Sequence, residues 1–279
     1  MKKPLGGESG GDLIRERLSS GAPCMVARFG SVEIKGALYP RLPGVLRRVL
    51  RAQVSRTMTV NAGFFPATDA MLARFSERMH EDMQQLDILG SWRVEERALL
   101  GRLGGVDRVE LSCLEPYLSS RPWSAALAGR KVLVVHPFSR TIEHQYHHHR
   151  AQLFANPEVL PPFRSLQTVK AVQSIAGNES GYADWFEALE AMKREIDTKD
   201  YDVAILGCGA YGFPLAAHIK RQGRQAVHLG GPTQILFGVR GLRWDQHPVI
   251  SGFANAHWVR PSPDDVPKDA VRVEGGCYW

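Results

Sequence analysis

A glycine-rich loop from Gly207 to Gly212 is the feature of the sequence that most directly suggests binding chemistry. It reads Gly-Cys-Gly-Ala-Tyr-Gly, follows an apolar run and precedes a segment that opens at Pro214. Glycines bring backbone N–H groups close to an anion, and a helix that starts there adds a partial positive charge. Gly207, Gly209, Tyr211 and Gly212 are therefore candidate phosphate-binding residues. The same pattern also occurs in tight turns whose glycines serve packing only.

A second glycine pair follows the next apolar run, which ends His228-Leu229-Gly230-Gly231. A dinucleotide site requires a carboxylate at this point to hold a ribose hydroxyl. Its absence argues against NAD and equally against S-adenosylmethionine. Ligands of open parallel sheets bind beyond the carboxyl ends of the strands, so both glycine loops should border one cleft. His228, Gly230, Gly231 and Gln234 join the candidate substrate-binding residues.

The segment from Arg28 to Glu33 places a guanidinium, a glycine (Gly30) and a carboxylate within one turn after another apolar run. The planar guanidinium matches a phosphate group. Glu33 could ligate a metal ion or act as a general base. The alternative is an ordinary Arg–Glu pair at the start of a helix, which would carry no function.

Three further candidates lie elsewhere along the chain. Glu115, in an expected loop, could deprotonate an acceptor hydroxyl. Thr141 and Gln145 follow the end of a predicted strand and could bind phosphate or sugar hydroxyls. His144 and His148 have the i, i+4 spacing that can share a zinc ion, but no Glu follows His144 as in the H-E-x-x-H motif. We interpret this histidine-rich stretch as a solvated helix face.

The elements that must position these residues alternate along the chain. Apolar runs predict strands over 24–29, 87–92, 131–136, 201–206 and 225–229, and amphipathic patterns predict helices near 11–19, 32–38, 68–86, 139–154, 185–196 and 214–222. Strands that alternate with helices predict a Rossmann-like α/β fold, a parallel sheet with helices on both faces. We expect one domain over 1–279, with the Pro-containing stretch 156–162 as the best candidate for a sub-boundary.

Composition sets the protein class. The chain has 279 residues, of which 44% are hydrophobic and 23% charged, and its net charge is +6. This balance is typical of a globular protein, and no motif points to nucleic acid. The four cysteines form no CxxC pair, which favours free thiols in a reducing compartment. Without a signal peptide or an apolar stretch of about 18 residues, we expect a cytoplasmic protein whose membrane association is at most peripheral.

The string Arg28-Phe29-Gly30-Ser31-Val32-Glu33 resembles the Arg-Phe-Gly-Asp-x-Glu signature of GT-D type glycosyltransferases, a family long described as a domain of unknown function. Other stretches are similar to a GT-D-like branch found near cell-surface polysaccharide genes, and together they span most of 24–279. These are Asn61–Phe65, Pro122–Ser124, Val134–Phe138, Thr141–Glu143, Gln145–Tyr146, Gly207–Pro214, His228–Gly231 and Glu274–Trp279.

The resemblance implies a GT-D-like fold and transfer of a sugar from a nucleotide-sugar donor to a hydroxyl acceptor, in polysaccharide or glycoconjugate synthesis. It adds Asn61 and Ser31 to the candidate substrate-binding residues. The family's Asp-x-Glu is associated with Mn²⁺ or Mg²⁺, but here Ser31 replaces the Asp and only Glu33 remains. A hydroxyl is a weak anchor for such an ion, so metal dependence stays open. The alternatives are a noncatalytic nucleotide- or sugar-phosphate-binding protein and another Rossmann-type transferase such as a methyltransferase.

Overall fold

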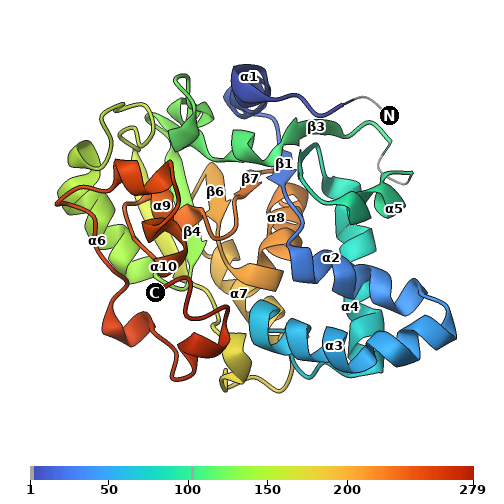
Figure 1. Cartoon of the computed structure of the whole chain (residues 1–279). Helices are drawn as coiled ribbons and strands as arrows, with labels where there is room; N and C mark the ends of the chain where they lie inside the picture. The colour runs from blue at the N-terminus through green and yellow to red at the C-terminus, as the bar shows by residue number, and fades with distance from the viewer. Residues whose placement is uncertain (1–2, 102–103) are drawn as a thin grey trace.

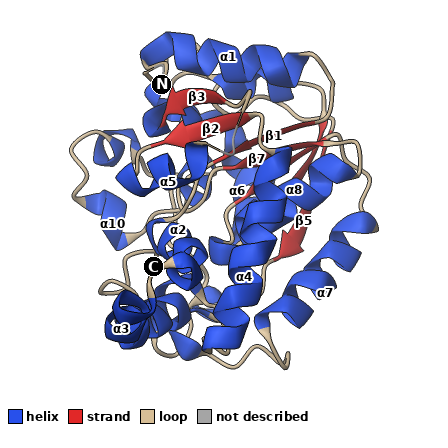
Figure 2. Cartoon of the chain, turned by 90° about the vertical axis from the view of Figure 1, so that its right-hand side faces the viewer, coloured by secondary structure: helices blue, strands red, loops and turns tan. Residues whose placement is uncertain are grey.

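The computed structural model describes residues 3–101 and 104–279. In that part of the chain, seven strands form one sheet in the order β3-β2-β1-β7-β6-β4-β5, and every neighbouring pair is parallel (Figures 1 and 2). The strands are β1 (Cys24–Ala27), β2 (Ile88–Ser91), β3 (Asp107–Glu110), β4 (Lys131–His136), β5 (Ser165–Lys170), β6 (Val203–Leu206) and β7 (Gln225–His228).

Helices cover both faces of the sheet, as the residues of β1 illustrate. Met25 and Ala27 belong to an apolar cluster with α2, α3, α4, α7 and α8, whereas Cys24 and Val26 belong to a second cluster with α1 and α6. Successive side chains of a strand point to opposite faces, so each face receives every second residue. The helices are α1 (Gly7–Ser19), α2 (Ser31–Leu38), α3 (Gly44–Ala62), α4 (Asp69–Asp82), α5 (Arg97–Leu100), α6 (Ser139–His149), α7 (Trp185–Asp197), α8 (Gly212–Arg221), α9 (Thr233–Leu236) and α10 (Leu242–Asp245).

This arrangement confirms the predicted Rossmann-like α/β fold. The strands β1, β6 and β7 are buried along their whole length, as expected of a sheet covered on both faces. Thr68 caps α4 by accepting a hydrogen bond from the Met71 N–H, and Phe75 and Met79 of that helix lie in the core. No helix of residues 3–101 and 104–279 is long and apolar enough to span a membrane.

The chain leaves the two adjacent strands β4 and β6 in opposite directions along the sheet. β4 leads through α6 to β5 on one side, and β6 leads through α8 to β7 on the other. Loops that part in this way leave a crevice at the carboxyl ends of the two strands, where open α/β sheets bind ligands.

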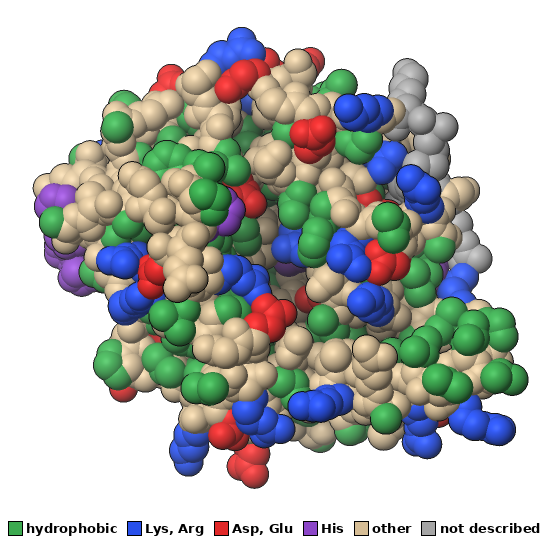
Figure 3. All heavy atoms as spheres, viewed as in Figure 1, with side chains coloured by type: hydrophobic (Ala, Val, Ile, Leu, Met, Phe, Trp, Pro, Cys, Tyr) green, Lys and Arg blue, Asp and Glu red, His purple; other side chains and the backbone are tan. Residues whose placement is uncertain are grey.

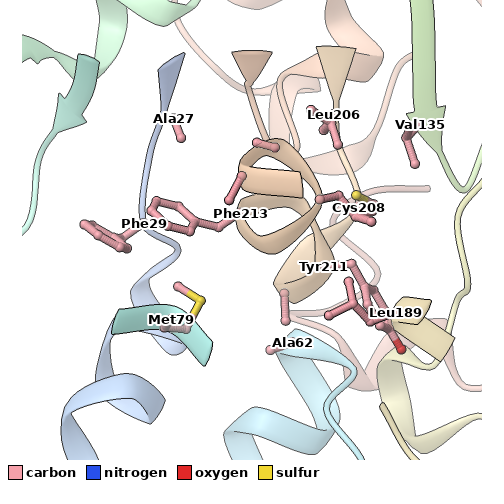
Figure 4. Packing of buried hydrophobic residues seen from close by; sticks show 14 of the residues in the cluster. Ala27, Phe29, Ala62, Met79, Val135, Leu189, Leu206, Cys208, Tyr211 and Phe213 are labelled. Carbon is pink, nitrogen blue, oxygen red and sulfur yellow. The ribbon is translucent and has the colours of Figure 1, made fainter. Parts of the chain in front are cut away.

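Aromatic stacking fixes the loops that leave β1 and β6. Phe213 of α8 stacks on Phe29 with ring centroids 4.8 Å apart, and Figure 4 shows the two rings side by side. Tyr211 stacks on Trp185 of α7 at 5.0 Å. The motif after β1 and the glycine loop after β6 are therefore anchored in the core, on the face of the sheet that α7 and α8 cover.

Candidate substrate-binding site

A cavity of about 420 Å³ lies at the carboxyl ends of β1, β4, β6 and β7. Figure 3 shows the surface hollowed near its centre. The cavity brings together twelve of the residues that the sequence singled out: Arg28, Gly30, Ser31, Glu33, Asn61, Gly207, Gly209, Tyr211, His228, Gly230, Gly231 and Gln234. Motifs separated by almost 200 residues thus share one site because parallel strands end at the same edge of the sheet.

The three glycines of the 207–212 loop have different roles. A Cβ on Gly207 would lie 2.6 Å from both His136 Cδ2 and Thr233 Oγ1, and one on Gly212 would collide with the His228 ring. These outer glycines serve packing, and Gly212 does not line the cavity. Gly209 differs because its φ is +54° and its surroundings are open on the cavity side. Only this middle glycine has the exposed, left-handed backbone suited to a phosphate.

Arg28 is held in place by its neighbours. Its Nε and Nη2 atoms donate to the Phe29 carbonyl at 3.2 and 3.0 Å, and Trp92 Nε1 donates to the same oxygen at 2.9 Å. The guanidinium carbon also lies 4.9 Å from the centroid of the Trp92 ring. Burial lowers the pKa of Arg28 and the Glu33 charge opposes that shift. The result is a preoriented cation on the cavity wall.

Glu33 occupies the first turn of α2, and its carboxylate lies over Gly30, where a Cβ would collide with it. Desolvation in the depth of the site raises the pKa of Glu33. Hydrogen bonds from the N–H groups of Glu33 and Val32, together with the Arg28 charge, act in the opposite direction, and the charge of Glu274 raises the pKa further. The carboxylate is thus folded back onto the start of its own helix.

The segment 274–279 forms another wall of the cavity. Glu274 pairs with Arg243, whose Nη1 also donates to Tyr278 Oη at 3.2 Å. Gln234 Nε2 donates to the Tyr278 carbonyl at 3.1 Å, so this predicted residue positions the segment. Trp279 closes the same wall. The site therefore holds a second guanidinium, Arg243, which lies in no sequence motif, and a second carboxylate, Glu274, which opens the motif 274–279 but was not among the predicted site residues.

Two buried histidines, His136 and His228, supply uncharged polar groups. Burial lowers the pKa of each to about 3, so both are neutral at physiological pH. His136 Nδ1 accepts the Phe138 N–H at 3.0 Å, which leaves its proton on Nε2. The charged side chains on the cavity lining are consequently Arg28, Arg243, Glu33 and Glu274.

The structure places three other predicted residues outside the cavity lining. Thr141 Oγ1 accepts the Ser262 N–H at 3.3 Å, and the buried Gln145 donates to the His257 carbonyl at 2.8 Å, so both hold the segment that follows α9. Glu115 accepts a 2.7 Å hydrogen bond from Tyr117, and burial raises its pKa. Its charge is close enough to raise the pKa of Arg28, which makes it a supporting neighbour of that residue.

A resident metal site is not preformed in the described part of the chain. No cluster of three or more His, Cys, Asp or Glu side chains able to hold an ion occurs in residues 3–101 and 104–279. His144 and His148 have ring centroids 4.6 Å apart and lie on an exposed helix face. The carboxylates of Glu33 and Glu274 on the cavity could hold Mg²⁺ or Mn²⁺ together with substrate phosphates, the arrangement Mg²⁺ commonly adopts.

No family model matches the sequence, and no curated protein matches it. Two solved structures are similar. One is the selenomethionine-substituted structure of domain of unknown function 1792, with 14% identity over 79% of this chain and 82% of that chain, and a TM-score of 0.40. The other is described as a new glycosyltransferase of the same domain type from Streptococcus sanguinis, with 11% identity over 94% and 96% of the two chains, and a TM-score of 0.42.

Proposed function

We propose that this protein is a glycosyltransferase that moves a sugar from a nucleotide-activated donor to a hydroxyl acceptor. The observation that carries the proposal is the convergence of Arg28, Arg243, Glu33 and the open backbone of Gly209 in one cavity of about 420 Å³. This volume lies in the range of small-molecule sites, and the lining combines aromatic surfaces with a few charged groups. The motif resemblance supports an acceptor in cell-surface polysaccharide or glycoconjugate synthesis.

The two guanidinium groups and the Gly209 loop would bind the donor diphosphate. When the bond between the anomeric carbon and the diphosphate breaks, its electron pair goes to the departing phosphate oxygen. Fixed cations stabilise charge that develops in this way more effectively than mobile ones. Arg28 meets this requirement because Phe29 and Trp92 already hold it.

Glu33 would accept the proton of the acceptor hydroxyl while the hydroxyl oxygen of the acceptor bonds to the anomeric carbon. A pKa raised by desolvation brings a carboxylate closer to the range where it acts as a general base near neutral pH. Glu115 lies off the cavity lining, and we propose that it supports Arg28 from behind. Glu274 is then the second carboxylate on the cavity.

Mn²⁺ or Mg²⁺ would enter with the donor and be held by Glu33 and phosphate oxygens. Such an ion would add positive charge beside the leaving diphosphate. In that case Glu33 is a ligand, and Glu274 is the carboxylate left to accept the proton.

A thermal-shift screen tests the proposal. Nucleotide-sugars, free nucleotides and S-adenosylmethionine are compared, with Mn²⁺ and with a chelator, and donor turnover is followed by mass spectrometry. A ligand at about a hundred times its Kd adds about 2.7 kcal/mol of stability. Stabilisation by a nucleotide-sugar together with its turnover supports a transferase, and stabilisation by S-adenosylmethionine alone contradicts it.

A noncatalytic nucleotide- or sugar-phosphate-binding protein is the second candidate. It is favoured by Ser31 in place of the family's Asp and by a Glu33 carboxylate engaged with its own helix. Nucleotide binding without turnover of any donor would select this candidate.

A further inference from the structure

Helix α3 begins on the surface and ends at the cavity. Asn61 and Ala62, at its end, line the cavity. At its start, residues 44–49 are all exposed. Val45 is 77% exposed and Val49 72%, the most exposed large apolar side chains of this helix.

These apolar side chains point away from the body of the protein. Val45 and Val54 are nine residues apart, which is about two and a half turns of helix, so they lie on opposite faces. Val54 is buried in the core with Met58. Val49 lies about one turn after Val45, and Leu46, 49% exposed, lies beside it. The three side chains form an apolar surface that nothing in the described part of the chain covers.

All charged residues of the same helix are basic. Residues 44–62 contain Arg47, Arg48, Arg51 and Arg56 and no Asp or Glu. Arg51 pairs with Asp69 at 3.5 Å, whereas Arg47 and Arg48 have no acidic partner among the described residues. Figure 3 shows hydrophobic side chains gathered at the lower right with Lys and Arg side chains beside them, where α3 begins in Figure 1.

We propose that the start of α3, residues 44–51, docks on an anionic lipid bilayer. Apolar side chains that project from a basic helix enter the boundary between headgroups and acyl chains, while guanidinium groups bind lipid phosphates. Arginine stems can lie along the apolar layer with their charged ends in the headgroup region. Within the described residues, the side chains of Val45, Leu46 and Val49 remain exposed, as insertion into a bilayer requires.

Other occupants match the surface less well. Nucleic acid would pair with the arginines but would leave Val45, Leu46 and Val49 in water. A stable protein partner commonly buries about 800 Å² on each side, more than these few side chains offer. The docking surface is separate from the cavity, so the proposal does not depend on the proposed function.

Co-sedimentation of the full chain with vesicles tests the proposal without any nucleotide. Vesicles of phosphatidylcholine alone are compared with vesicles that also contain phosphatidylglycerol. We expect binding to the anionic vesicles only, weakened by salt. The double variant Arg47→Gln/Arg48→Gln should lower the partition coefficient at least tenfold, since each basic residue near an anionic surface contributes about a fivefold factor.

The matched control is Arg140→Gln/Arg194→Gln, which removes the same charge from exposed positions of α6 and α7 and should bind like the wild type. Val45→Ser/Val49→Ser keeps every charge and should also lower binding about tenfold. All these side chains are exposed, so circular dichroism should show unchanged folding. The proposal is overturned if the wild type binds neither kind of vesicle, or if Arg140→Gln/Arg194→Gln weakens binding as much as Arg47→Gln/Arg48→Gln. It is also overturned if Val45→Ser/Val49→Ser abolishes self-association and leaves lipid binding unchanged.

Discussion

The Nη1 atom of Arg28 crosses Gly230 so closely that a Cβ on residue 230 would lie 3.3 Å from it. Gly230 also has a φ of +76°, which other residues rarely adopt. A side chain at residue 230 would therefore press on the cation that follows β1.

Gly230→Ala should impair nucleotide binding beyond its effect on stability. The left-handed backbone costs about 1–2 kcal/mol for a residue with a Cβ, and the new methyl group also presses on Arg28. Calorimetric titration with a nucleotide should show an affinity loss. Gly129→Ala is the matched control, because its φ is +71° and nothing lies within 4 Å of the added Cβ. Equal affinities in the two variants would contradict a role for the Gly230–Arg28 contact.

Gly209→Val should abolish nucleotide binding while cooperative unfolding persists at a lower Tm. The φ of +54° disfavours a branched residue by about 1–3 kcal/mol, and the side chain would fill the place of a phosphate. Gly223→Val, at a φ of +78° with open surroundings, controls for backbone strain alone. Unchanged nucleotide affinity in Gly209→Val would show that the loop is only a turn.

Ser31→Asp separates a metal-dependent transferase from a metal-free binder. With a second acid restored, a metal-dependent enzyme should bind Mn²⁺ more tightly and keep or raise its turnover. In a metal-free binder the added negative charge should weaken nucleotide affinity, and Mn²⁺ should restore little. Affinity and donor turnover are measured with metal and with chelator.

Glu33→Gln keeps the shape of the side chain and removes its charge, so turnover should fall by orders of magnitude, on the scale of about 10²–10⁴ for the loss of a general base. Turnover close to that of the wild type would assign the base to another group.

The raised pKa of Glu33 has consequences for pH dependence. A carboxyl group whose pKa in the folded state exceeds its ordinary value of 4.5 favours the protonated form on folding. Its stabilising contribution is therefore complete below about pH 4.5 and is lost as the pH rises through the folded-state pKa. The wild type should lose stability relative to Glu33→Gln across that window, whereas transfer should rise as Glu33 becomes a base. Denaturant unfolding and turnover of both proteins over pH 4–8 check the two opposite trends.

The sequence predicted the central strands well because their burial leaves a plain signal. β1, β6 and β7 are buried at every residue, and apolar runs mark them. The edge strands were harder. In β5 only Val169 is buried, and in β3 only Val109, so neither carries an apolar run. Their assignment depends on pairing with β4 and β2, which is a tertiary property.

The site residues also divide into those that local sequence marks and those that only the fold brings together. Residues directly after apolar strands, such as Arg28 and Gly209, could be placed at the sheet edge from local sequence. Trp92 ends the predicted strand 87–92, but no motif singles it out as a site residue. Arg243 lies in no predicted element, and only the fold brings it to the cavity. Thr141 and Gln145, predicted to bind substrate, follow β4 as expected. Their side chains instead form hydrogen bonds with the segment after α9.

The folded-back Glu33 carboxylate has a consequence for the order of substrate addition. It already takes the N–H groups at the start of α2 that an incoming diphosphate would use. If the protein is the transferase proposed above, a donor diphosphate that binds there would displace this carboxylate and free it to meet the acceptor hydroxyl. Kinetics with both substrates varied should follow an ordered sequence, donor before acceptor, and the acceptor alone should bind weakly.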